Sequence, residues 1–199
     1  MIIYNFPQGS PEWHAIRKGK LTASHATAIG NCGAGLVTYV DDIVLEMCIE
    51  PEQYYNSDME RGNELEPVAR AVYEFENEIQ TQQVGFIQYN DYVGFSPDSL
   101  VGDDGGLELK ARNDKIHFKL LKDGKVDSSA IWQMNMGMLI TGRKWWDFGS
   151  YNPNFKQSLF IKRFYPEEKK FDGLLKGFDL GTEMIKELLN NENIKKELK

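Results

Sequence analysis

Two acidic residues and a lysine lie close together in the sequence and could share one site. Glu108 follows Asp98 by ten residues, and Lys110 comes directly after the next residue. Two carboxylates can hold a hard divalent cation through oxygen. A neighbouring lysine can position or polarise a water or a phosphate oxygen. The alternative is a solvated acid–x–Lys pair on an exposed strand, which contributes little.

A hairpin is expected to bring these three side chains together. The segments 92–95 and 99–101 have the pattern of short strands, and residues 102–106, Gly-Asp-Asp-Gly-Gly, are a strong turn signal. Residues 107–111 would form the returning strand. Because side chains alternate across a strand, Glu108 and Lys110 would share one face, with Leu107 and Leu109 on the other.

This arrangement resembles a known nuclease core. An aspartate, a variable gap and Glu-x-Lys form the core of the PD-(D/E)xK nuclease superfamily, and Pro97-Asp98 with Glu108-Leu109-Lys110 matches it. Four more segments resemble, in family order, the phage lambda exonuclease or YqaJ-type viral recombinase family: 12–24, 61–74, 132–138 and 145–153. One chance match to the core motif is common, whereas five ordered matches are not.

The resemblance implies a role for each candidate in the catalytic centre. Asp98, Glu108 and the backbone carbonyl of Leu109 would hold Mg²⁺, with Mn²⁺ able to substitute, and Lys110 would position or activate the attacking water. Glu66 would reach the metal directly or through water and support a second cation. Gln133 would contact the scissile phosphate or its water. Without the resemblance, Glu66 is an ordinary surface charge and Gln133 an ordinary buried or surface amide.

Three further residues match family positions that bind a terminal 5′-phosphate: Arg17, Ser24 and Ser96. The forked guanidinium of arginine suits phosphate. Ser24 is expected in the first turn of a helix that starts at Thr22, where free backbone N–H groups attract anions. Taken alone, Arg17 is an ordinary cation near a helix C-terminus.

The function implied by the resemblance is a Mg²⁺-dependent exonuclease that digests one strand of duplex DNA from its 5′ end. It would leave 3′ single-stranded tails for recombination by strand annealing. Its expected partners are double-stranded DNA ends, two further copies of the chain in a closed trimer, and a single-strand annealing protein. Two alternatives stay open: an end-independent endonuclease of repair or restriction, and a non-catalytic DNA-binding or assembly module.

The composition limits these possibilities further. The chain has 199 residues, 41% apolar and 12% aromatic, which suits one packed domain over residues 1–199. Its net charge of −7 argues against a polycation that coats DNA. Cys32 and Cys48 lack the spacing of a zinc or iron–sulfur site. With no signal-peptide pattern and no apolar run near ~20 residues, we expect a cytoplasmic protein without membrane contact.

The order of predicted elements indicates an α/β fold with a central mixed β-sheet flanked by helices, built on a restriction-endonuclease-like core. A mobile loop is expected over 31–35, and the regular part of the helix that contains Pro67 should start near Glu64. Residues 190–199 are expected to fray, and His14, His25 and His117 to be non-catalytic. Helices are predicted over 11–18, 22–29, 39–49, 58–78, 114–121, 128–140 and 166–189, and strands over 84–89, 92–95, 99–101, 107–111, 145–151 and 157–164.

Overall fold

The main β-sheet is mixed, as the sequence predicts. The computed structural model describes residues 1–49 and 57–198. β7 lies at the centre of the sheet, pairs in parallel with β8 and antiparallel with β6, and the outer strands are also antiparallel. The strand order is β3 (Thr81–Gln82), β6 (Ser99–Val101), β7 (Gly105–Ala111), β8 (Trp145–Tyr151) and β9 (Leu159–Phe164).

A second, smaller sheet lies beside the first and was not expected from the sequence. It joins β1 (Ile2–Tyr4), β4 (Phe86–Asn90), β5 (Val93–Phe95) and β2 (Leu21–Thr22) in that order, with β2 parallel to β5. β5 and β6 belong to different sheets. Residues 96–98 therefore carry the chain from one sheet to the other.

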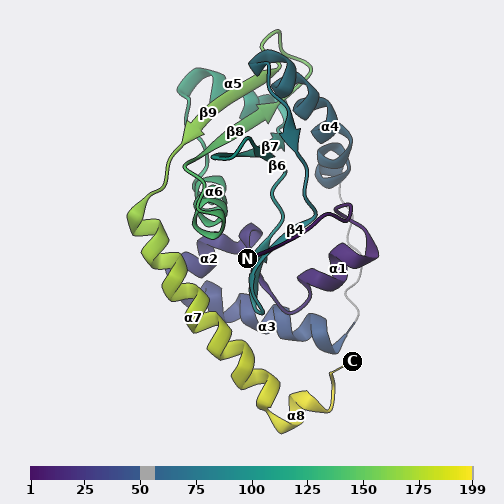
Figure 1. The fold of residues 1–199 in the computed structure, drawn as a ribbon, viewed down its shortest axis with the longest axis vertical. Coiled ribbons are helices and arrows are strands. Elements are labelled where there is room, and N and C mark those ends of the chain that lie inside the picture. The colour runs from purple at the N-terminus through teal and green to yellow at the C-terminus, as the bar shows by residue number, and fades with distance from the viewer. Residues whose placement is uncertain (50–56, 199) are drawn as a thin grey trace.

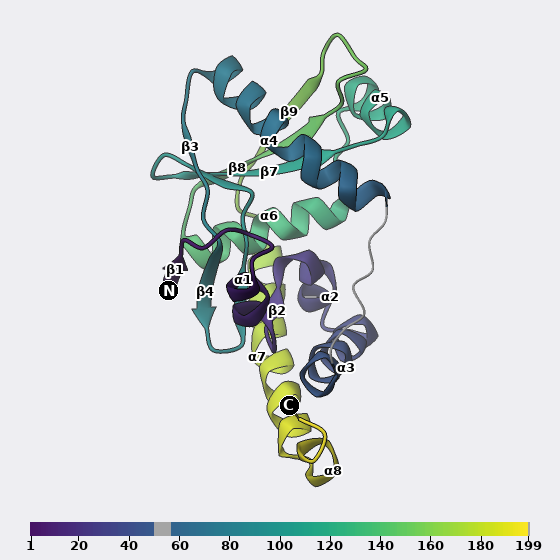
Figure 2. The same ribbon diagram turned by 90° about the vertical axis from the view of Figure 1, so that its right-hand side faces the viewer.

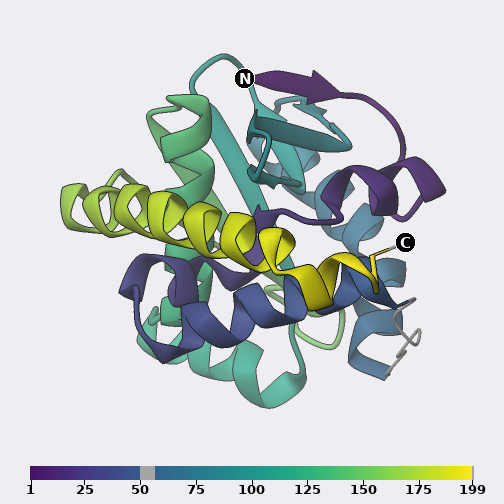
Figure 3. The ribbon, with the colours of Figure 1, turned by 90° about the horizontal axis from the view of Figure 1, so that it is seen from below.

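Helices cover both faces of the main sheet (Figure 2). α4 (Ser57–Asn77) packs on one face and α6 (Ser128–Thr141) on the other. The long helix α7 (Glu168–Asn190) lies along α2 (Ala26–Asn31) and α3 (Ala34–Cys48), as Figure 3 shows from below. The remaining helices are α1 (Pro11–Arg17), the 3-10 helix η1 (Ala23–His25), α5 (Asp114–Asp123) and α8 (Glu192–Lys195) (Figure 1).

Two predictions about helices and loops are wrong. Thr22 lies in β2, and the α-helix after it begins only at Ala26 because the hydroxyl of Thr22 bonds Tyr39 instead of capping. The predicted loop 31–35 is short, because Cys32 takes a left-handed conformation (φ 51°) and α3 starts at Ala34. Within the end that was expected to fray, residues 192–195 form α8, capped by Asn191, and the fraying stays a prediction; residue 199 lies outside the described residues.

α4 also continues through Pro67, although its regular part was expected to start near Glu64. Proline removes one helical N–H. Packing of Ala69 and Tyr73 against Leu107 and Leu109 of β7 holds this helix on the sheet despite that loss. Pro67 therefore lies within the element that carries Glu66.

Gly105 and Gly106 belong to β7 and not to the turn predicted for them. A Cβ on Gly106 would come within 2.3 Å of the Trp146 ring, and one on Gly105 within 2.1 Å of the Trp145 ring. These glycines are therefore needed because the indole rings of β8 lie directly against the backbone of β7. Gly102, with φ +52°, supplies the turn conformation itself.

Candidate active site

The hairpin brings Asp98, Glu108 and Lys110 together. Ser99 pairs with Leu107, so the preceding Asp98 meets the residue that follows Leu107. Lys110 Nζ lies 2.5 Å from Glu108 Oε1, and Asp98 Oδ2 accepts the N–H of Leu109 at 2.6 Å. Glu108 is almost completely buried, with 2% of its surface exposed.

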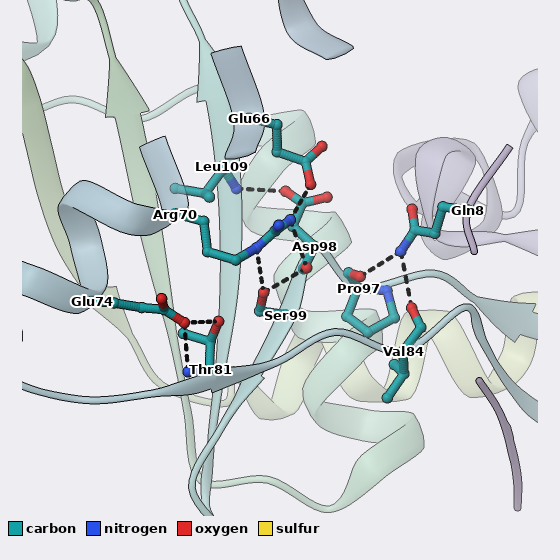
Figure 4. Close-up of polar contacts among 10 residues, drawn as sticks. All are labelled: Gln8, Glu66, Arg70, Glu74, Thr81, Val84, Pro97, Asp98, Ser99 and Leu109. Carbon is teal, nitrogen blue, oxygen red and sulfur yellow. Dashed lines mark hydrogen bonds and ion pairs between the residues drawn. The ribbon is translucent and has the colours of Figure 1, made fainter. Parts of the chain in front are cut away.

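Glu66 reaches the same place from α4. It forms an ion pair with Arg70, one turn further along the helix. Glu66, Asp98 and Lys110 line a cavity of about 340 Å³, together with Leu109, Arg61, Arg112 and other residues of α4, β7 and the start of α5. Residues from three separate segments of the chain therefore meet at one concave surface, as Figure 4 shows in part for Glu66, Asp98 and Leu109.

Burial and mutual repulsion set the charges of this cluster. Burial raises the pKa of Glu108 to about 8, and the nearby Asp98 carboxylate adds to that rise. Burial also raises the pKa of Asp98 and of Glu66. The pKa of Lys110 is raised too, chiefly by the charge of Glu108. The pKa values of the acids rise chiefly because burial disfavours their charge, whereas the pKa of Lys110 rises because of its acidic neighbours; a bound cation would compensate the buried carboxylates.

The donor chemistry suits a hard divalent cation, since every candidate ligand is an oxygen. Glu108 Oε1 is buried and accepts no hydrogen bond, although it pairs with the charge of Lys110. Over residues 1–49 and 57–198, no three His, Cys, Asp or Glu side chains are gathered closely enough to form a ready metal cage. The carboxylates of Glu66, Asp98 and Glu108 are held instead by Arg70, Leu109 and Lys110. Binding a metal would require them to exchange some of these contacts.

Gln133 lies on α6, half-buried. Phe148, the neighbour of Glu108 in β8, packs in the same hydrophobic cluster as α6. Glu108 and Phe148 are register partners, so both side chains point toward the α6 side of the sheet. Gln133 and Glu108 thus lie on the same side, although the hydrogen bonds described for this part of the chain do not join them.

A second cavity, of about 390 Å³, lies between α1, η1 and α3 and is lined by Arg17 and Ser24. Trp13 Nε1 donates a hydrogen bond to Ser96 Oγ at 2.8 Å, and Arg17 Nη1 donates to the same oxygen at 3.4 Å. The guanidinium of Arg17 stacks over the Trp13 ring, with Cζ 4.2 Å from its centroid. Burial lowers the pKa of Arg17, but an arginine remains charged at neutral pH.

Ser24 joins this cavity through a chain of hydroxyl groups. Its Oγ lies 3.2 Å from Thr22 Oγ1, which in turn lies 3.0 Å from the hydroxyl of Tyr39. Ser24 is in a 3-10 turn, where an α-helical turn was predicted. His25, expected to be non-catalytic, lines the cavity, stacks on Tyr39 at 3.8 Å between ring centroids and places Nδ1 3.2 Å from Ser24 Oγ. The sequence held one indication that His25 lines this cavity, namely its position directly after Ser24.

Residues that line each cavity contact or belong to the short connection between the sheets. Ser96 contacts Trp13 and Arg17 on one side, and two residues later Asp98 faces the carboxylate cavity on the other.

Among the described residues no helix is long and apolar enough to cross a membrane.

Comparison with known proteins agrees with this geometry. An alkaline exonuclease, LHK-Exo from Laribacter hongkongensis, is 31% identical with a TM-score of 0.82, covering 94% of this chain and 95% of that one. LHK-Exo in complex with dAMP gives 30% identity and a TM-score of 0.83 over the same shares, 94% and 95%. A phage-related exonuclease from Haemophilus somnus 129PT, 13% identical over 85% of this chain and 95% of that one, shares the fold with a TM-score of 0.64.

Among curated proteins no significant match is found. The model of the YqaJ-like viral recombinase domain matches residues 12–144, which is most of the chain and contains Asp98, Glu108 and Lys110. This chain belongs to the YqaJ-like viral recombinase domain family.

Proposed function

We propose that this protein is a divalent-metal-dependent exonuclease that degrades one strand of duplex DNA from its 5′ end and leaves a 3′ single-stranded tail. One observation carries the proposal. The segment from Ser96 to Asp98 links a cavity that offers Arg17 and Ser24 to a cavity that offers carboxylates. A terminal phosphate held at the first cavity would leave an adjacent phosphodiester within reach of the second. The similarity to alkaline exonuclease LHK-Exo supports the same activity.

Asp98, Glu108 and the carbonyl of Leu109 would hold Mg²⁺, or Mn²⁺ in its place, with Glu66 supporting a second ion. Such a metal stabilises negative charge on a phosphoryl group and lowers the pKa of bound water. Burial and the nearby Asp98 carboxylate raise the pKa of Glu108 to about 8, and this supports the assignment because a bound cation would compensate the buried negative charge.

Lys110 would act as a charged hydrogen-bond donor that orients water or a phosphate oxygen. The Glu108 carboxylate 2.5 Å away holds the pKa of Lys110 above its usual range, so the ammonium keeps its proton at neutral pH. Gln133, on the same side of the sheet as Glu108, would orient the scissile phosphate or its water through a neutral amide.

Direction of digestion would come from Arg17. The non-bridging oxygens that a metal would contact are alike at every phosphodiester, so choosing the end from which digestion starts needs a group that recognises a terminal phosphate. Arg17 is charged and can give two parallel hydrogen bonds to a terminal phosphate. Ser96, which already accepts from Arg17 and Trp13, and Ser24 would complete the contacts to that group.

The test is digestion of four DNA substrates in Mg²⁺: linear duplexes with 5′-phosphate or 5′-hydroxyl ends, a nicked circle and a closed circle. We expect degradation of linear duplex, faster from the phosphorylated end, with the closed circle intact and Asp98→Asn inactive. Cutting of the closed circle would favour an end-independent endonuclease. Binding of every substrate without cleavage would favour a non-catalytic module.

A further inference from the structure

Arg70 contacts three groups of the carboxylate site at once. It lies on α4 one turn after Glu66 and is 8% exposed. Its Nη2 donates to Glu66 Oε1 and, at 3.3 Å, to the backbone carbonyl of Asp98. Its Nε donates to Ser99 Oγ at 2.9 Å (Figure 4). One guanidinium therefore ties a helix to the turn that connects the two sheets.

Two of these contacts converge on the backbone of Asp98. Ser99 Oγ, which accepts from Arg70, itself donates to the Asp98 carbonyl at 2.6 Å. The carboxylate of Asp98 is held separately by the N–H of Leu109. The backbone and the side chain of Asp98 are thus held by different elements, and Arg70 contacts the backbone carbonyl both directly and through Ser99.

The other side of the same turn is held by Gln8. Its Nε2 donates to the carbonyl of Pro97 at 2.8 Å and to the carbonyl of Val84 at 3.1 Å. Figure 4 shows Gln8 and Arg70 on opposite sides of the Pro97–Asp98 turn. Two consecutive carbonyl groups are therefore held by side chains that lie far apart in the sequence.

We propose that Arg70 is a positioning residue of this site, which fixes Glu66 and Asp98 relative to one another and thereby sets the affinity for the divalent cation. The inference rests on the metal-dependent function proposed above. Groups that hold metal ligands in place without touching the metal usually change metal affinity or activity ~10–100-fold when removed. Glu66 and Asp98 come from α4 and from the β5–β6 connection, and Arg70 contacts both.

Arg70→Lys separates geometry from charge. A lysine keeps the positive charge beside Glu66, but a single ammonium on a flexible stem cannot hold three acceptors in one plane. If Arg70 only neutralises the carboxylates, the lysine variant should bind metal as the wild type does. If it positions them, the lysine variant should be impaired and Arg70→Met impaired at least as much.

The experiment is calorimetric titration of Mn²⁺ into the protein without DNA, followed by steady-state kinetics on 5′-phosphorylated duplex. For Arg70→Lys we expect Mn²⁺ affinity to fall by ~10-fold or more and kcat to fall, with KM for DNA ends little changed because Arg17 and Ser96 are untouched. Gln8→Ala should weaken Mn²⁺ binding less, since it leaves Glu66 in place. The matched control is Glu74→Ala, one turn further along α4, which loses two hydrogen bonds to Thr81. It should bind Mn²⁺ as the wild type does.

Asp98→Asn distinguishes failure of this inference from failure of the proposed function. If Asp98→Asn binds Mn²⁺ normally, the metal site itself is misplaced. If Asp98→Asn loses binding but Arg70→Lys keeps wild-type affinity, or changes only KM, Arg70 does not position the ligands. Should Arg70→Met fail to fold, Arg70→Lys, checked by circular dichroism, decides the question.

Discussion

Glu108 is the most deeply buried carboxylate of the candidate site, and its charge is costly when no metal is bound. Its pKa of about 8 lies above the ordinary value of 4.5, so the folded state holds the proton more tightly than the unfolded chain. This contribution to stability is therefore complete below pH 4.5 and is lost as the pH rises through about 8.

Glu108→Gln should accordingly stabilise the metal-free protein, increasingly so at higher pH. The gain in free energy of unfolding should be on the order of a few kcal/mol at pH 9 and smaller at pH 6. The variant does not leave Lys110 without an acidic neighbour, because Asp98 remains close to it. Thermal unfolding with a chelator at both pH values measures the difference. The same substitution at the exposed Glu187 is the control, and a loss of stability at Glu108 that does not vary with pH would contradict the prediction.

Lys110→Ala should separate turnover from binding. The loss of one donor aimed at developing charge typically lowers kcat ~10²–10³-fold. Mn²⁺ affinity should hold or rise, since the variant removes a cation that pairs with Glu108. Single-turnover kinetics measure turnover, and a separate Mn²⁺ titration measures metal binding. A loss of metal affinity as large as the loss of turnover would contradict the role proposed for Lys110.

Arg17→Ala should slow cleavage of 5′-phosphorylated ends far more than of 5′-hydroxyl ends. Hydrogen bonds to charged groups contribute ~1.5–3 kcal/mol each, so the ratio of the two rates should fall by at least tenfold. Trp13→Phe, which removes only the indole bond to Ser96 and keeps a ring under Arg17, should have a smaller effect on that ratio. If Arg17→Ala lowered the cleavage rates of 5′-phosphorylated and 5′-hydroxyl ends equally, this cavity would not bind the terminal phosphate.

At the scale of elements, predictions succeed where a local pattern is long enough. β8 has the predicted bounds over seven residues, and the short β6 was found only because a glycine-rich turn follows it. β1, β2 and β3 have two or three residues each, too few for an alternating pattern. Their pairing depends on neighbours far along the chain.

The same distinction applies to the candidate site. Asp98, Glu108 and Lys110 are neighbours across one hairpin, so their meeting could be predicted from local sequence. Arg70 and Gln8 could not, since their hydrogen bonds to the Pro97–Asp98 turn span 28 and 89 residues. Long-range contacts of this kind leave no periodic signal in a single sequence.

α4 is attached to the main sheet by a buried polar cluster as well as by apolar packing. Asp147, with 2% exposed, accepts the hydroxyl of Tyr73 at 2.8 Å and two bonds from Arg163, at 2.8 and 2.9 Å. Asp147→Asn should destabilise the protein by ~3–5 kcal/mol, because it leaves buried partners unpaired. Tyr73→Phe should cost only ~1 kcal/mol. Denaturant unfolding measures both, and a neutral Asp147→Asn would mean that packing alone holds α4.

At the scale of the whole molecule, we propose that the two sheets form one domain. A single hydrophobic cluster contains Ile87 and Val93 of the smaller sheet together with Trp146 and Phe148 of the main sheet. Such a continuous core predicts one cooperative unfolding transition.

The net charge of −7 bears on how the protein could follow DNA. We propose a closed trimer, which would direct basic groups to a central channel and acidic groups outward, and whose 3′-tailed product would be passed to a single-strand annealing protein. Light scattering should then give about three times the chain mass of 22.8 kDa. A monomer at micromolar concentration would argue against the ring. The control is Asp98→Asn, which should assemble as the wild type does.

The parallel pairing of β7 with β8 has a consequence for synthesis on the ribosome. Leu107 pairs with Asp147, so β7 can pair with β8 only after α5 and α6, which lie between them in the chain, have been synthesised. Until then β7 has an open edge next to apolar side chains, a state prone to wrong pairing. Nascent chains that end before Trp145 should therefore be protease-sensitive and unable to bind Mn²⁺, and protection should appear only once β8 has left the exit tunnel.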